Sequence, residues 1–288
     1  MKNVKALVLT GFGINCEEEM AAAYRMAGAE ANIVYFNEVL LRGHSIHNYD
    51  ILNFPGGFSF GDDLASGKVM ANKIRHKRLA NGKTLLDEIL AFLKAGKYIL
   101  GICNGFQMLV RLGLLPNTSV KFEQEATLSA NNSGKYEDRW CYCKVNPTTK
   151  SPFLKGLDIL ALPVRHGEGK LIIKDEQVRQ QVQNQSLNSL TYCDAEGNTA
   201  TTYPANPNGS DLSCAGLNDP TGQILGLMPH PEAFLSLYNH PNWGQLRRQN
   251  PNRSEKGEGL FLFKNIVNHI ESGAKSLTQA KAPINHNS

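Results

Sequence analysis

A single cysteine lies between two glycines at the point where an apolar run ends and a helical pattern begins. The segment is Gly101-Ile102-Cys103-Asn104-Gly105, and the apolar run before it spans 98–102. This spacing is that of a nucleophile elbow with cysteine in place of serine. A tight turn from strand to helix leaves no room for a Cβ beside the nucleophile, which explains the glycines. Cys103 would then open a helix, where free N–H groups and the helix dipole favour the thiolate.

A cysteine nucleophile needs a base, and His230 has the most informative setting of the eight histidines. It follows the apolar run 224–228, and Pro231 favours extended geometry at His230. Residues two apart on an extended chain point to the same side, so Glu232 can orient the imidazole. Cys103, His230 and Glu232 thus have the types required of nucleophile, base and orienting acid. The alternatives, an inert core thiol and a plain strand-end histidine, are weakened because both motifs occur in one chain.

Acyl transfer also requires donors for a tetrahedral oxyanion. Two glycines, Gly56 and Gly57, follow the apolar run 50–54, and backbone without side chains can turn its N–H groups toward a neighbouring site. We predict that the N–H of Gly57 or its neighbour forms the oxyanion hole together with the N–H of Asn104. The alternative is an ordinary glycine turn.

Strand and helix signals alternate through the first 115 residues, which predicts a parallel sheet covered by helices. The predicted strands are 5–9, 32–36, 50–54 and 98–102, and the predicted helices are 17–26, 84–94 and a helix from 104 that ends at Gly113. We therefore expect an α/β fold, a flavodoxin-like three-layer sandwich with a mostly parallel central sheet, helices on both faces and some antiparallel edge strands.

The second half of the chain is less regular. Strands are predicted at 140–145, 158–164, 169–173 and 223–228, and a final helix at 259–270. One domain is expected over 1–272, followed by a polar, flexible tail over 273–288. Two basic stretches, 68–83 and 240–256, are predicted to be loops, each either a docking surface for another subunit or a solvated face.

Composition limits the remaining function classes. The chain has 41% hydrophobic residues, a net charge of +4 and no sustained basic block, which argues against nucleic acid and membrane partners. The six scattered cysteines predict a reducing, cytoplasmic location rather than a disulfide framework. Cys141 and Cys143 lack a second pair at metal-ligand spacing, so no metal is predicted. Cys16 opens a helix but has no apparent base, and we assign it to packing.

Several motifs together resemble one family. They are "GICNGFQ" (101–107), "FPGGFSFGDDLASGK" (54–68), "HGEG" (166–169), "YPANPNGS" (203–210) and "MPHPE" (228–232). The elbow cysteine, the glycine loop and the late His-x-Glu are similar to those of class I, triad-type glutamine amidotransferases. Within that class, the motifs resemble those of the glutaminase subunits of phosphoribosylformylglycinamidine synthase, over residues 4 to 272. The chain departs from the family pattern at Ala233, where arginine is frequent, and at Arg165, where a small residue is common.

The resemblance implies a reaction and a partner. Cys103 would attack the carboxamide of glutamine, His230 would protonate the departing ammonia, and Gln107 would help to line the glutamine pocket. The ammonia would pass to a synthetase subunit, with or without a small bridging subunit, for the ATP-dependent conversion of formylglycinamide ribonucleotide in purine biosynthesis. His166 would lie near the mouth of the site or the partner interface, or would be a plain loop histidine.

No cofactor is expected in this chain. The segment 61–68 has five residues between its glycines where a phosphate loop has four, and Val69 replaces the metal-binding hydroxyl residue. The glycines at 11 and 13 are followed by Cys16 where a dinucleotide fingerprint requires glycine. ATP and magnesium are therefore expected on the partner. The alternative functions are a stand-alone cysteine hydrolase of γ-glutamyl or peptide substrates and a non-catalytic binding module.

Overall fold

The computed structural model describes the backbone of residues 3–280 and the side chains of residues 3–273. The strands are β1 (Lys5–Thr10), β2 (Glu30–Tyr35), β3 (Ile51–Phe54), β4 (Tyr98–Ile102), β5 (Ala126–Ser129), β6 (Glu137–Val145), β7 (Ile159–His166), β8 (Lys170–Ile173), β9 (Asn188–Cys193), β10 (Cys214–Asn218) and β11 (Ile224–Leu227). The α-helices are α1 (Glu17–Met26), α2 (Phe36–Leu41), α3 (Lys68–His76), α4 (Leu85–Lys94), α5 (Asn104–Arg111), α6 (Glu176–Asn184), α7 (Trp243–Gln249) and α8 (Leu260–Ala280).

A nine-stranded sheet in the order β2-β1-β3-β4-β11-β10-β9-β6-β7 forms the centre of the described chain. The first five strands in this order pair in parallel, and their arrangement is the flavodoxin-like one, with β11 in the fifth place. The last four strands join through antiparallel pairings, and β5 and β8 form a separate antiparallel pair. The predicted fold class is thus confirmed, with an antiparallel part larger than a few edge strands.

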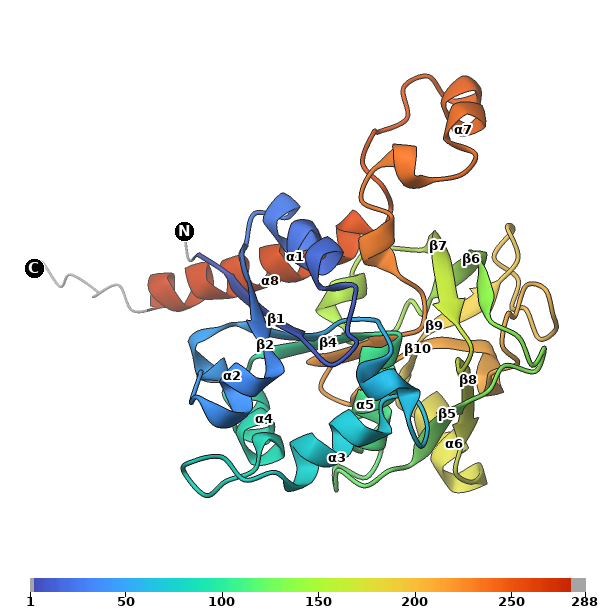
Figure 1. Ribbon diagram of the computed structural model, residues 1–288. Helices are drawn as coiled ribbons and strands as arrows, with labels where there is room; N and C mark the ends of the chain where they lie inside the picture. The colour runs from blue at the N-terminus through green and yellow to red at the C-terminus, as the bar shows by residue number, and fades with distance from the viewer. Residues whose placement is uncertain (1–2, 281–288) are drawn as a thin grey trace, which may run out of the picture.

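Helices cover both faces of the parallel part of the sheet (Figure 1). Helices α1 and α8 lie together on one face, and α2, α3, α4 and α5 lie on the other. The strands between these layers are apolar on both sides, as expected for a parallel sheet that is covered twice. In β4, for example, Ile99, Leu100 and Ile102 are fully buried. The three-layer arrangement therefore agrees with the sequence pattern.

Two segments predicted to be loops contain helices instead. Within 68–83, residues 68–76 form α3, because Met70, Ala71 and Ile74 are spaced to bury one helical face beneath an otherwise basic segment. Within 240–256, residues 243–249 form the short, exposed helix α7. Helices α2 and α6 and strands β5, β9 and β10 are also present but were not predicted.

The predicted polar tail is partly helical. Residues 273–280 continue α8 beyond the expected end of the final helix at 270. Residues 281–288 lie outside the described residues. Among the described residues, no helix is both long and apolar enough to cross a bilayer.

The elbow depends on an unusually close approach of α5 to the sheet. A Cβ on Gly105 would lie 1.8 Å from the carbonyl oxygen of Phe54 in β3, and one on Gly101 would lie 2.5 Å from Leu109 Cδ1. Neither residue has a left-handed φ, so the glycines are required for space rather than for backbone freedom. This close packing fixes the start of α5 relative to the ends of β3 and β4.

We predict that Gly105→Ala destabilises the protein by about 3 kcal/mol or more, because the clash is with backbone that has no rotamer to change. Urea unfolding provides the measurement. Gly244→Ala in the exposed helix α7 is the control, since its Cβ would meet nothing closer than 3.7 Å, and it should be neutral or slightly stabilising. Equal stabilities of Gly105→Ala and the parent would contradict the packing argument.

Candidate active site

Cys103 lies at the turn from β4 into α5, in a conformation that non-glycine residues rarely adopt. Its φ is 51° and its ψ is −105°, so the turn holds a strained backbone of the kind found at functional sites. The Cys103 N–H donates to the carbonyl of Leu227 in β11 at 2.8 Å. The residue is 6% exposed, and its Sγ lies 3.5 Å from the carbonyl oxygen of Arg165.

The parallel pairing of β4 with β11 brings His230 to the same end of the sheet. Ile102 pairs with Leu227, and His230 follows three residues later, held by its N–H to the carbonyl of Pro163 in β7 at 2.8 Å. His230 Nδ1 and Glu232 Oε1 are 2.6 Å apart, and both side chains are buried. The pair forms across a 3-10 turn at Pro231–Ala233, so the predicted extended geometry was wrong although the predicted contact is present.

The two nitrogens of the His230 ring have different surroundings. Because a carboxylate only accepts hydrogen bonds, Nδ1 donates to Glu232. Nε2 is buried and has no hydrogen-bond partner among the described residues. Burial alone would lower the pKa of His230, but the Glu232 charge and two neighbouring thiols raise it well above its ordinary value. These thiols belong to Cys103 and Cys16, so the sulfur of the predicted nucleophile lies close enough to the ring to affect its pKa.

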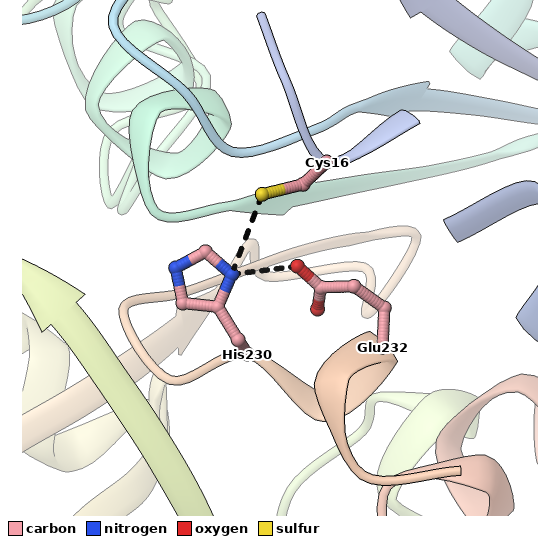
Figure 2. Close-up of side chains that lie close together, drawn as sticks. All are labelled: Cys16, His230 and Glu232. Carbon is pink, nitrogen blue, oxygen red and sulfur yellow. Dashed lines mark hydrogen bonds and ion pairs between the residues drawn. The ribbon is translucent and has the colours of Figure 1, made fainter. Parts of the chain in front are cut away.

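Cys16 lies next to His230, a contact that the sequence did not predict. Its Sγ lies 4.0 Å from His230 Nδ1, so the statement that it lacks a base was wrong (Figure 2). Cys16 directly precedes α1, and its N–H donates to the carbonyl of Gly56 at 3.3 Å. Burial raises the pKa of this thiol above its ordinary value. No motif links Cys16 to position 230; the tertiary structure alone brings them together.

The predicted oxyanion loop lies against the histidine. A Cβ on Gly56 would be 2.7 Å from His230 Cε1, which places this backbone at the edge of the imidazole. Gly57 has a φ of 144° and lies opposite Ile14 in an antiparallel bridge. In this bridge the N–H of Asn15 donates to the carbonyl of Gly56, and the N–H of Phe58 donates to the carbonyl of Gly13. The N–H of Gly57 takes no part in the pairing.

Asn104 and Gln107 connect this loop to the elbow through their side chains. Asn104 Oδ1 accepts a hydrogen bond from the Ser59 N–H at 3.2 Å, and its Nδ2 donates to Gln107 Oε1 at 2.9 Å. Gln107 Nε2 donates to the carbonyl of Glu168 at 2.6 Å. Both side chains are buried, and their hydrogen bonds connect the loop to the start of α5. The backbone N–H of Asn104 is the first of α5, where N–H groups have no partner within the helix.

Two further residues border the predicted triad. His166, for which the sequence left several positions open, is the last residue of β7. It is 2% exposed, and its Nδ1 lies 3.0 Å from Asn131 Oδ1. Burial and the charge of His230 lower the pKa of His166 to about 4, so this ring is neutral at physiological pH. Tyr136 is half exposed, and burial followed by the charge of Cys103 raises its pKa. Tyr136 carries no sequence signal for this position.

Comparisons with known proteins agree with this arrangement. The sequence matches the family described as CobB/CobQ-like glutamine amidotransferase domain over residues 3–270. It is 42% identical over 268 residues to the phosphoribosylformylglycinamidine synthase subunit PurQ of Dehalococcoides mccartyi, covering 93% of this chain and 98% of the relative. It is 41% identical over 275 residues to the subunit PurQ of Methanococcus maripaludis, covering 92% of this chain and 98% of the relative.

A solved structure gives the same result. The PurLQS structure from Thermotoga maritima contains a chain with a TM-score of 0.66 and 27% identity, covering 93% of this chain and all of that one. Over nearly their full lengths, the two PurQ relatives share the sequence of this chain, and the Thermotoga maritima chain shares its fold. The chain therefore belongs to the CobB/CobQ-like glutamine amidotransferases and, within them, to the PurQ subunits of phosphoribosylformylglycinamidine synthase.

Proposed function

We propose that this chain is the glutaminase subunit of a phosphoribosylformylglycinamidine synthase, which hydrolyses glutamine and supplies the ammonia to a synthetase subunit. The observation that carries this proposal is the buried His230–Glu232 pair, which lies at the same end of the sheet as an elbow cysteine in a chain 42% identical to a PurQ subunit. The synthetase uses the ammonia to convert formylglycinamide ribonucleotide to formylglycinamidine ribonucleotide. ATP and magnesium are assigned to that partner.

In the proposed reaction, the Cys103 thiol gives its proton to His230 and the sulfur attacks the carboxamide carbon of glutamine. The oxyanion that forms accepts hydrogen bonds from the N–H groups of Gly57 and Asn104. His230 transfers a proton to the departing ammonia, which leaves a γ-glutamyl thioester on the sulfur. Water then attacks the thioester and loses a proton to His230, and glutamate leaves as the thiol forms again. Glu232 keeps the ring in one orientation and stabilises its charged form.

The comparisons support a synthetase partner and a small bridging subunit. The name PurLQS specifies two components besides the Q subunit. The matching protein of Drosophila melanogaster, phosphoribosylformylglycinamidine synthase, is 35% identical over 270 residues that make up 19% of its length. About four fifths of the Drosophila melanogaster chain lies outside this match and could contain the synthetase part of the enzyme. A cytoplasmic location is also proposed, and the six unpaired cysteines support it.

The arm formed by residues 236–256 is our candidate for the surface that contacts the synthetase. It projects from the body of the protein and carries α7 at its tip (Figure 1). Tyr238 and Trp243 are exposed on the arm with ring centroids 5.3 Å apart, and the arm also contains Arg247, Arg248 and Arg253. Exposed Trp, Tyr and Arg together are typical of interface hot spots. Two residues after Glu232, the buried Phe234 packs on His240 and so connects the arm to the triad.

Cys103→Ala should reduce glutamate release by the complex with the synthetase by at least about 1000-fold, because the nucleophile is lost. Cys193→Ala, which removes a buried thiol in β9, should retain the activity. The alanine complex should still form product from added ammonium salts, which separates loss of the glutaminase from loss of assembly. Wild-type glutamate release by Cys103→Ala would refute the mechanism.

Glu232→Gln should lower the pKa of His230, because burial is then no longer opposed by the carboxylate charge. A histidine whose pKa is higher in the folded state stabilises the protein at pH values below its pKa in the unfolded chain, which is about 6.5. This stabilisation is lost as the pH rises through the pKa of the folded state. The stability difference between parent and variant should therefore be largest below about pH 6.5 and shrink toward alkaline pH.

NMR titration of the ring and urea unfolding at acid and alkaline pH measure these two effects. Glu232→Asp, which keeps the charge on a shorter side chain, is the matched control and should retain part of the raised pKa. An unchanged His230 titration in Glu232→Gln would show that the carboxylate does not stabilise the charged ring.

Trp243→Ala should weaken binding of the synthetase by about tenfold or more while the isolated chain remains folded. Tyr35→Ala removes another exposed aromatic ring, on the edge strand β2, and should bind normally. Calorimetric titration of the two subunits measures both affinities. If the two variants bind equally well, the arm is not the contact surface.

A further inference from the structure

Three metal-ligand side chains from distant parts of the sequence meet beside the predicted nucleophile. One donor atom each from Cys16, His230 and Glu232 lies within 4.8 Å of the other two. In Figure 2 the Cys16 sulfur and a Glu232 oxygen both approach the same ring nitrogen, Nδ1 of His230. We propose that these side chains form an inhibitory binding site for Zn²⁺, distinct from the Cys103 sulfur.

The donor set selects the kind of ion. Thiolate, imidazole and carboxylate are the three ligand types of zinc, and three protein ligands leave the fourth tetrahedral position to water. Magnesium and calcium prefer oxygen donors throughout, so a site with one sulfur and one nitrogen disfavours them. The chemistry therefore indicates a borderline-soft divalent ion.

The distances require only small movements. Tetrahedral zinc with ordinary bond lengths places sulfur and nitrogen about 3.5 Å apart, and nitrogen and oxygen about 3.3 Å apart. The corresponding separations are 4.0 Å from Cys16 Sγ to His230 Nδ1 and 2.6 Å from Nδ1 to Glu232 Oε1. The Cys16 sulfur and the Glu232 oxygen lie within 4.8 Å of each other, where tetrahedral zinc places them about 3.6 Å apart. Movements of about 1 Å by the thiol and the carboxylate therefore complete the site.

A second observation concerns Glu232. Its side chain is buried, yet Oε2 has no hydrogen-bond partner among the described residues. Leaving a buried carboxylate oxygen unpaired is costly, and a bound cation would compensate its charge. Cys16 is only partly buried, so the cluster has a side that reaches solvent.

Zinc at this position would invert the roles of the two ring nitrogens. The ion replaces the Nδ1 proton and the Cys16 thiol proton, and the ring proton that remains lies on Nε2. Nε2 can then no longer accept a proton. This inhibitory effect rests on the proposed role of His230 as base, whereas binding of the ion does not.

Cobalt(II) is a spectroscopic probe that tests the site without an activity measurement. The full-length chain, titrated with Co²⁺, should show a thiolate-to-cobalt charge-transfer band and the visible bands of tetrahedral cobalt. Cys103→Ser should keep these bands and Cys16→Ser should lose them. Bands that require Cys103 but not Cys16, or no thiolate band in the parent, would overturn the proposal.

Inhibition is measured on glutamate release by the complex with the synthetase. Each protein is compared with itself with and without Zn²⁺, and Cys16→Ser should need at least about tenfold more zinc for half-inhibition. Equal zinc sensitivity of parent and Cys16→Ser would refute the inhibitory site. Because Cys103→Ser tests the cobalt site without turnover, failure of the proposed reaction and failure of this site give different results.

An alkylation experiment on the wild-type chain tests the site even if Cys16→Ser does not fold. Zinc should protect Cys16 from alkylation, as measured by mass spectrometry. Cys103 should still react with the alkylating reagent when zinc is bound. Protection of Cys103 without protection of Cys16 would place the ion on the nucleophile and contradict the proposal.

Discussion

The parallel pairing of β4 with β11 is the contact on which the site depends. Positions 103 and 230 are far apart in sequence, and the register that joins Ile102 to Leu227 brings both to the carboxyl end of the sheet. Ligand sites of open α/β sheets lie at this end. The register is kept by apolar residues that are buried on both faces, and by Gly105, which lets α5 approach Phe54.

The residues with a local signature could be predicted from the sequence. Cys103 stands between a buried strand and a helix that both follow clear patterns, and Glu232 is two residues from His230, so their contact needs no long-range information. The parallel half of the sheet was predictable for the same reason. Its strands are short apolar runs bounded by glycine, proline or a helical pattern.

What could not be predicted lacks a local pattern. Strands β9 and β10 have the sequences NSLTYC and CAGLN. Many of their buried residues are polar or small, and buried and exposed positions do not alternate along either strand. Helix α3 has three buried apolar residues within a basic segment, too few for a strong periodic signal. Cys16 reaches His230 because the loop after β1 pairs with the loop after β3, a contact between loops that no spacing along the chain encodes.

The amide side chains of Asn104 and Gln107 connect segments that lie far apart in the sequence. They link the backbone at Ser59 and at Glu168 to the first turn of α5 by hydrogen bonds that are shielded from water. Two loops from separate parts of the chain are thereby connected to the start of one helix. Because of these hydrogen bonds, a movement of either loop would also strain the turn that carries the Asn104 N–H.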